Sequence, residues 1–246
     1  MDSKTAHVLQ IVKAALSIFR EKGYNQASVR EIASAAGVSL GMINHYFGSK
    51  EFLGTQCLKI LSDYSMSLLN ENLSIENEPI LYDLVAVRAL YQYLNRYGYE
   101  TFYRESLEND FFLKYLSDYP TTIVRILSRT YPIEATEDEI QLYSRYLPYM
   151  MEKTLVLKKH AGLFTSIDYE QIPYIIVATA LNRFIPEQAI KDRDAESIRI
   201  AEEIISPLEP SVPDDFLLGF VERYVKRLED TNASQKASWI RKMKLV

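Results

Sequence analysis

The stretch from residue 28 to residue 50, SVREIASAAGVSLGMINHYFGSK, constrains the fold of this 246-residue chain most strongly. Ser28 with Glu31 three positions later is the pattern of a capping box, which predicts the start of a short helix. Gly37 supplies the left-handed backbone conformation that ends this helix. A tight turn through Ser39 then leads into a second helix. Two short helices joined in this way are the plan of a helix-turn-helix.

The apolar positions of the two helices agree with one shared core. Ile32, Ala33 and Ala36 fall on one face of the first helix, and Ile43 and Phe47 of the second can close on them. In a helix-turn-helix, the outward face of the second helix enters the DNA major groove. The side chains left on that face are Leu40, Met42, Asn44 and His45, with Gly41 between them.

Each of these residues suits a particular contact with base edges. Asn44 can offer a donor and an acceptor to adenine, and Leu40 and Met42 can contact thymine methyl groups. Gly41 lacks a side chain, so the helix backbone can come close to the DNA. His45 can donate to a base or to a phosphate.

Four further residues suit the phosphate backbone, where contacts fix register without reading sequence. Ser39 and the backbone N–H groups at the start of the second helix can approach a phosphate, which the helix dipole favours. Tyr46 and Lys50 suit phosphate oxygens. Ser28 is either a helix cap alone or a cap that also touches phosphate, and Tyr46 has an alternative place in the core of the head.

Residues 5 to 60 resemble the DNA-binding domain of the TetR family of transcriptional regulators. The matching pieces stand in register: FREKGY at 19–24, Ser28, Ile32–Ala33, AGVS at 36–39, Tyr46–Phe47 and SKE at 49–51. Two positions depart from the family pattern, because Asn44 is more often tyrosine there and Gly48 is often lysine. The first departure implies a different operator preference, and the second removes one phosphate contact.

Every long periodic segment in the rest of the chain is helical, which predicts an all-α fold. The apolar spacing from residue 8 to residue 19 predicts a first helix, and a fourth helix begins at Ser49 and reaches toward Leu69. The polar stretch from Glu71 to Pro79 breaks the pattern and marks the boundary of the second domain. Further helices are expected near 79–97, 100–106, 108–129, 137–160, 168–185, 187–206 and 213–230.

We therefore expect an N-terminal three-helix helix-turn-helix domain in residues 1–50 and a larger helical domain in residues 51–246. The helix from about residue 49 links them. The TetR resemblance implies that the larger domain binds an effector and dimerises through two late helices, which we expect to be 168–185 and 213–230. The alternative is that the apolar faces of these helices are buried in the monomer's own core. The tail from residue 234 to residue 246 is expected to be frayed, with a short amphipathic helix as the alternative.

Aromatic residues gather in the middle of the chain and form the candidate effector site. Tyrosine has a flat apolar body and a polar tip, which suits a small amphipathic or aromatic molecule. Glu100, Glu105 and Glu108 lie nearby and would favour a cationic ligand, whereas the other interpretation of the aromatic run is plain core. The expected ligand-binding residues are Tyr91, Tyr97, Phe102, Tyr103, Phe112 and Tyr115.

Charge and composition set further limits. Residues 1–60 carry a net charge of +3 and the whole chain −5, so the remainder sums to −8. A basic head on an acidic chain fits a protein that touches phosphates at one end, although +3 over sixty residues is also an ordinary fluctuation. The sequence has no apolar run of membrane-spanning length, no secretory signal and a single cysteine, Cys57, so we expect a cytoplasmic protein without a membrane partner.

Sequence motifs of enzymes are missing. The chain has no phosphate-binding glycine loop, no Gly-x-Ser-x-Gly elbow and no metal-type cysteine pair. We therefore expect no catalysis, cofactor or metal. The predicted function is a sequence-specific DNA-binding transcriptional regulator, a homodimeric repressor that a small-molecule effector releases from a palindromic operator. The alternative is a helical protein-interaction domain with a degenerate DNA-binding head.

Overall fold

The protein is described by a computed structural model that covers residues 1–111, 113, 122–209 and 211–243. Within these ranges the secondary structure is helical and contains no strand, which confirms the predicted all-α class. None of the helices in this part of the chain is both long and apolar enough to cross a lipid bilayer. The elements are α1 (Ser3–Gln26), α2 (Val29–Ala35), α3 (Leu40–Phe47), α4 (Lys50–Asn72), α5 (Pro79–Arg96), α6 (Glu100–Glu108), α8 (Thr122–Leu127), α9 (Glu137–Gln141), the π-helix η1 (Leu142–Tyr146), α10 (Leu147–His160), the 3-10 helix η2 (Tyr169–Gln171), α11 (Ile172–Leu181), α12 (Glu187–Ile205) and α13 (Asp214–Met243).

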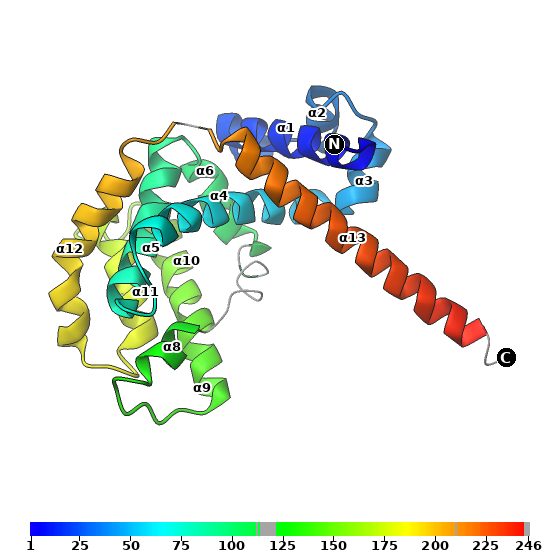
Figure 1. Ribbon diagram of the computed structural model, residues 1–246. Coiled ribbons are helices and arrows are strands. Elements are labelled where there is room, and N and C mark those ends of the chain that lie inside the picture. Colours follow the sequence, from blue (N-terminus) through cyan, green and yellow to red (C-terminus); the bar gives the residue numbers. More distant parts are fainter. Residues whose placement is uncertain (112, 114–121, 210, 244–246) are drawn as a thin grey trace.

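Helices α1, α2 and α3 form a head at one end of the molecule (Figure 1). Ile11 of α1, Ile32 of α2 and Ile43 of α3 are all fully buried. The head is therefore held together by the apolar faces that the 3.6-residue periodicity predicts. Ser49 caps the next helix, since the backbone N–H of Phe52 donates to the Ser49 hydroxyl at 3.1 Å.

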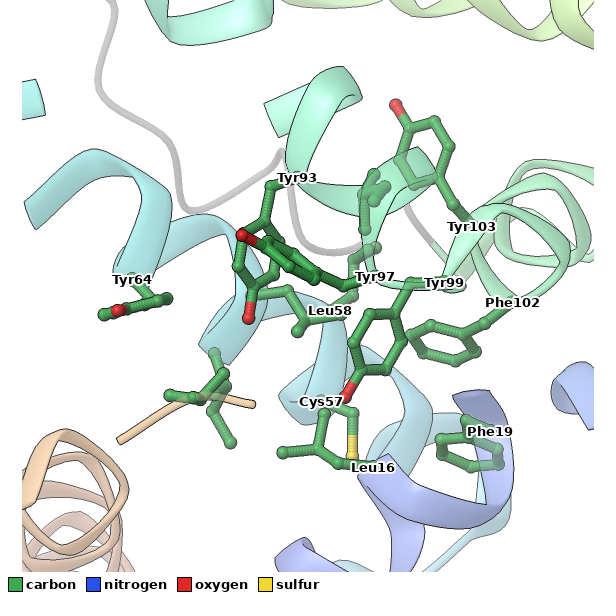
Figure 2. Packing of buried hydrophobic residues seen from close by; sticks show 14 of the residues in the cluster. Leu16, Phe19, Cys57, Leu58, Tyr64, Tyr93, Tyr97, Tyr99, Phe102 and Tyr103 are labelled. Carbon is green, nitrogen blue, oxygen red and sulfur yellow. The ribbon is translucent and has the colours of Figure 1, made fainter. Parts of the chain in front are cut away.

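Helix α4 runs without a break from the head into the larger body (Figure 1). The buried apolar side chains of the head and of much of the body form one continuous cluster. Figure 2 shows how this cluster is joined: Phe102 of α6 stands next to Phe19 of α1. The two rings stack with their centroids 4.8 Å apart. Helix α6 is therefore in direct contact with the first helix of the head.

The body is built around α5, which packs along α12. The Arg88 side chain is buried and ties the two helices together. Its Nε donates to the Ser197 hydroxyl at 2.8 Å, its Nη1 donates to the Glu170 backbone oxygen at 2.8 Å, and its Nη2 pairs with Asp194. These bonds satisfy the buried guanidinium, as a charge removed from water requires. Helices α10 and α11 also pack on one another, and α11 packs on α5.

Helix α13 crosses the head and then extends away from the rest of the molecule (Figure 1). It packs on α1 and α4. Lys4 and Lys13 of α1 form salt bridges with Glu229 and Asp214 at 2.6 and 2.7 Å. Because these pairs are exposed, each contributes less than about 1 kcal/mol. The expectation that the helix ends near residue 230 and that a frayed tail follows is wrong, since the backbone remains helical to Met243.

Two other predicted helices have different bounds in the structure. Residues 108–129 were expected to form one helix, but α6 ends at Glu108 and Asp110 has a left-handed φ of 59°. Asn109 ends the helix because its side-chain amide donates to the Glu105 backbone oxygen at 2.8 Å, a local bond of the kind that competes with a continuing helix. The expected helix 168–185 starts as the 3-10 turn η2, and its α-helical part ends at Leu181.

The apolar faces that we expected at a dimer interface are buried within one chain. On α11, Ile172 and Leu181 are fully buried. On α13, Leu217, Phe220 and Val221 are buried against other parts of the same cluster. For these residues the structure follows the alternative stated above, because periodicity identifies an apolar face but not the surface that covers it.

Candidate nucleic-acid interface and internal cavity

The turn between α2 and α3 is fixed by local bonds. The Glu31 N–H donates to the Ser28 hydroxyl at 3.2 Å, and the Ser28 N–H donates to the Glu31 carboxylate at 3.1 Å. This confirms the predicted capping box. Gly37 ends α2 with a φ of 65°, and the Val38 N–H closes the turn on the Ala33 oxygen at 3.0 Å. The direction in which α3 leaves the turn is therefore set by bonds within residues 28–38.

One face of α3 is open to solvent. Gly41, Asn44 and His45 are exposed, and Leu40 is 39% exposed. Met42 is half-buried. The opposite face is anchored by the buried residues Ile43 and Phe47. A short helix anchored on one side and exposed on the other has the geometry that a major groove accepts.

The predicted phosphate contacts occupy different surroundings. Ser39 is exposed and its side chain makes no capping bond to α3. The Ser28 hydroxyl is engaged in the capping box. Tyr46 is half-buried against the core, with its ring edge-on to His45 at 5.0 Å. The Lys50 ammonium lies 4.1 Å from the centre of the Tyr24 ring.

Lys50 thus belongs to the junction between head and body as well as to the head. Burial lowers the pKa of Lys50, and the charge of Glu105 acts in the opposite direction. A cation placed over an aromatic face is attracted by the ring quadrupole. A phosphate contact by Lys50 would therefore compete with its place over Tyr24.

Helix α13 supports the end of α3. The Tyr224 ring stacks on Phe47 with centroids 5.3 Å apart, and its hydroxyl donates to the Tyr46 backbone oxygen at 2.7 Å. That oxygen lies in the last turn of α3, where carbonyl groups lack a partner within the helix. Tyr224 therefore satisfies an acceptor at the end of the candidate recognition helix.

We expect Tyr224→Phe to destabilise the protein by about 1 kcal/mol, because it removes a buried hydroxyl donor and keeps the ring. Urea denaturation checks this. The matched control is Tyr146→Phe, at an exposed tyrosine of η1, which should leave the unfolding midpoint unchanged. Equal midpoints for all three proteins would contradict the role of the Tyr224 hydroxyl.

A cavity of about 320 Å³, partly open to solvent, lies between the helices of the body. Its wall is formed mainly by α4, α5, η1, α10 and α11, with Tyr103 of α6 and the start of α8. Most of this wall is apolar, from side chains such as Met66, Val87, Leu90 and Ile176. Its volume lies at the small end of the range for ligand pockets, roughly 300–1,000 Å³.

The structure brings two of the six predicted ligand-binding residues to this cavity. Tyr91 and Tyr103 line it. Tyr97 lies elsewhere and donates from its hydroxyl to the Ile205 backbone oxygen at 3.2 Å. Phe102 packs against α1. The other two, Phe112 and Tyr115, lie outside the described residues.

The glutamates that we considered near this site do not line the cavity. Glu100 and Glu108 are exposed. Glu105 is buried at the head–body junction, where its carboxylate accepts from the Asn25 N–H at 2.8 Å.

Two acids that sequence reasoning missed do line the cavity, Asp83 and Glu152. Burial raises the pKa of each to about 7. Glu152 accepts from the Tyr91 hydroxyl at 2.7 Å and from the Tyr103 hydroxyl. Asp83 could have been found from its spacing, because Asp83, Val87 and Tyr91 recur every four residues on one face of α5.

The geometry of α2, the turn and α3 defines the class of the protein, a helix-turn-helix protein with a larger helical body. Comparison with known protein families identifies which helix-turn-helix family the head is similar to. Residues 11–53 match the family model described as bacterial regulatory proteins, tetR family. The match to this family covers the head and the start of α4.

Curated relatives are similar to part of the chain. The regulator BetI of Vibrio campbellii is 40% identical over 65 residues, which cover 26% of this chain and 33% of BetI. The fatty acid metabolism regulator protein of Bacillus subtilis is 43% identical over 51 residues, 21% of this chain and 26% of that protein. The repressor AcnR of Corynebacterium glutamicum is 32% identical over 93 residues, 35% of this chain and 50% of AcnR. The matched segments thus span half or less of these relatives.

Among solved structures, a gamma-butyrolactone receptor described as ArpA-like is similar over 82% of this chain and 99% of its own length. Its TM-score is 0.44 and its sequence identity is 16%.

Proposed function

We propose that the protein is a sequence-specific DNA-binding transcriptional regulator that acts as a repressor and has no catalytic role. The observation that carries this proposal is the exposed face of α3, held in place by Ile43 and Phe47 beneath it. Asn44, His45 and Leu40 are the residues we assign to base edges. Ser39 and the N–H groups at the start of α3 are assigned to phosphate, together with Tyr46 and Lys50.

We further propose that the regulator binds a palindromic operator as a homodimer. A recognition helix of eight residues is about 12 Å long, so one head reaches only a few base pairs. Two heads about one DNA turn apart, roughly 34–36 Å, would contact successive major grooves. The effect of a dimer is therefore to supply the specificity that one short helix lacks.

The internal cavity is the proposed site for a small amphipathic or aromatic effector. Helix α4 supplies Ser62, Ser65 and Met66 to the cavity wall, and it begins two residues after the end of α3. Helix α6 supplies Tyr103 to the same wall and Phe102 to the contact with α1. A ligand that binds more tightly to a different arrangement of α4 and α6 would favour conformations in which the two recognition helices of the dimer are wrongly spaced for DNA. Such a ligand would lower the affinity for the operator.

Selection of bound fragments from random duplex DNA tests this function. A regulator should enrich a palindrome, and its affinity should fall steeply with salt as condensed counterions are released. A protein-interaction domain with a degenerate head would enrich no sequence. Failure to bind any duplex at low ionic strength would refute the proposal.

On the selected operator we expect Asn44→Ala to weaken binding about 10- to 100-fold, since one bidentate base contact contributes about 1–3 kcal/mol. The loss should be largest on the selected sequence and small on unrelated DNA. Asn77→Ala, at an exposed asparagine far from the head in sequence, is the matched control and should bind as the parent does. Equal affinities for the two variants, measured by fluorescence anisotropy, would exclude Asn44 from the interface.

A further inference from the structure

Among the described residues, the wall of the cavity contains more acid than base. Its wall includes two carboxyl groups, those of Asp83 and Glu152, and one guanidinium, that of Arg145. Arg145 also interacts with Glu137 of α9. A hydrogen bond from Gln141, followed by the positive charges of Arg125 and Arg145, lowers the pKa of Glu137 below its usual value. The local charge of the cavity is therefore negative when both acids are ionised.

Asp83 is the first acidic point of the cavity. Among the described residues, no donor hydrogen-bonds to its carboxyl group and no cation pairs with it. The Asp83 side chain is half-buried, and a carboxylate that is partly removed from water without such a partner is stabilised by a proton or by an external cation. This is the group in the wall that a bound cation would stabilise most.

Glu152 forms the second acidic point of the cavity and is 5% exposed. Its Oε1 atom accepts from the hydroxyls of both Tyr91 and Tyr103. Tyr91 lies eight residues after Asp83 on one face of α5, which corresponds to about 12 Å along the helix. The two acidic points thus lie apart, with the apolar side chains of Val87 and Leu90 on the stretch of α5 between them.

A third polar group is left unused in the same wall. The Ser65 side chain of α4 is 2% exposed, and its hydroxyl has no hydrogen-bond partner in the described structure. Buried hydroxyls are rarely left without a partner. An unpartnered hydroxyl that lines a cavity indicates a site where a ligand or water completes the bonding.

We propose that the cavity binds a small organic cation, an ammonium group attached to an apolar or aromatic body. The ammonium is held by the carboxylate of Asp83 and the body lies along Val87 and Leu90, toward Glu152 and its two tyrosines. Tyrosine faces in the wall add attraction for a cation. This inference rests on the proposed function, because it names the chemical class of the proposed effector.

The test compares three probes on the unmodified protein by isothermal titration calorimetry. Benzyltrimethylammonium is the cation, benzyl alcohol the neutral analogue and phenylacetate the anion. We expect the cation to bind at least tenfold more tightly than the other two. Preference for the anion or the neutral analogue, or absence of binding by all three, overturns the inference. Since only unmodified protein is used, this comparison does not depend on the folding of any variant.

Substitution then locates the site. Asp83→Asn preserves the shape of the side chain and removes the charge, so it should weaken cation binding about tenfold or more. Asp138→Asn, at an exposed acid of α9 outside the cavity, is the matched control. Equal affinity of the two variants for the cation would overturn the assignment to Asp83.

The pH dependence gives a further readout. The titratable groups in the wall are Asp83 of α5, Glu152 of α10, Arg145 of η1 and the tyrosines Tyr82, Tyr91, Tyr103 and Tyr149. Burial raises the pKa of these tyrosines, so they stay neutral. Cation affinity should therefore rise as pH increases from 6 to 8 and the carboxyl groups ionise. A flat or falling profile overturns the inference.

Failure of this inference is distinguishable from failure of the proposed function, because duplex selection is measured without any probe. A protein that enriches a palindrome but does not prefer the cation remains a regulator and loses this ligand class. A protein that prefers the cation but ignores DNA keeps the cation site and loses the regulator function.

Discussion

Replacing Gly23 by alanine is expected to lower the free energy of unfolding by about 3 kcal/mol. Gly23 has a φ of 78° and a ψ of −177° within α1, a backbone region that is essentially restricted to glycine and costs another residue about 1–3 kcal/mol. An added Cβ would lie 2.6 Å from Glu105 Oε2 and 2.7 Å from Thr101 Cγ2. Overpacking of this kind adds about 1–3 kcal/mol.

The clash cannot be relieved cheaply, because Glu105 is held in place. Its carboxylate accepts from the backbone N–H of Asn25, directly after Gly23 and Tyr24. Moving Glu105 away would leave a buried carboxylate without its bond to the Asn25 N–H. The variant should therefore weaken the junction between α6 and the head, and with it the DNA affinity proposed above.

Gly37→Ala is the matched control for this prediction. Gly37 also has a positive φ, 65°, but a Cβ there would meet no atom within 4 Å. Its substitution should cost only the backbone term of about 1–2 kcal/mol. Urea denaturation of both variants measures the two losses of stability, and equal losses would show that Glu105 does not restrain Gly23.

The local features of the head could be predicted from sequence because each depends on a few neighbouring residues. Ser28 and Glu31 form their capping box within four residues, and the Gly37 turn is closed by a bond from Val38 to Ala33. Apolar periodicity likewise identifies Ile32 and Ile43 as core. These are short-range interactions whose partners are determined by the helix period itself.

The long-range features could not be predicted for the same reason. Periodicity gives α13 an apolar face but does not say that this face covers the head, where Tyr224 bonds to the end of α3. The acidic cavity was missed because Asp83 and Glu152 are 69 positions apart and each reads as an ordinary helix-surface acid. Only the packing of α5 and α10 reveals that both face one hollow.

The half-buried Asp83 leads to the second large effect, an increase in stability on Asp83→Asn that grows with pH. The carboxyl has a pKa of 3.8 in the unfolded chain and about 7 in the folded protein. Between pH 3.8 and about 7, Asp83 is therefore protonated in the folded state and ionised in the unfolded state. The free energy of unfolding consequently falls as the pH rises through this range. Asparagine does not titrate, so the variant escapes this loss.

The expected size of this gain depends on the pH range over which the free energy of unfolding is measured. Each pKa unit corresponds to about 1.4 kcal/mol, so the gain in unfolding free energy from Asp83→Asn should be roughly 2–3 kcal/mol larger at pH 8 than at pH 5. Glu152 contributes the same pH dependence to the unfolding free energy of the parent and of the variant, since burial also raises its pKa to about 7. Urea denaturation of parent and variant at the two pH values measures the difference directly.

The exposed control Asp138→Asn should show no such pH-dependent gain. A gain from Asp83→Asn that is equal at pH 5 and pH 8 would mean that the folded protein does not raise the pKa of Asp83. If the proposed cation binds beside the carboxylate, a saturating concentration of benzyltrimethylammonium should reduce the gain at pH 8, because the ligand supplies the missing counter-charge only to the parent. The stability of the free protein and its ligand preference would then have one cause, the half-buried Asp83 carboxylate, which has no partner among the described residues.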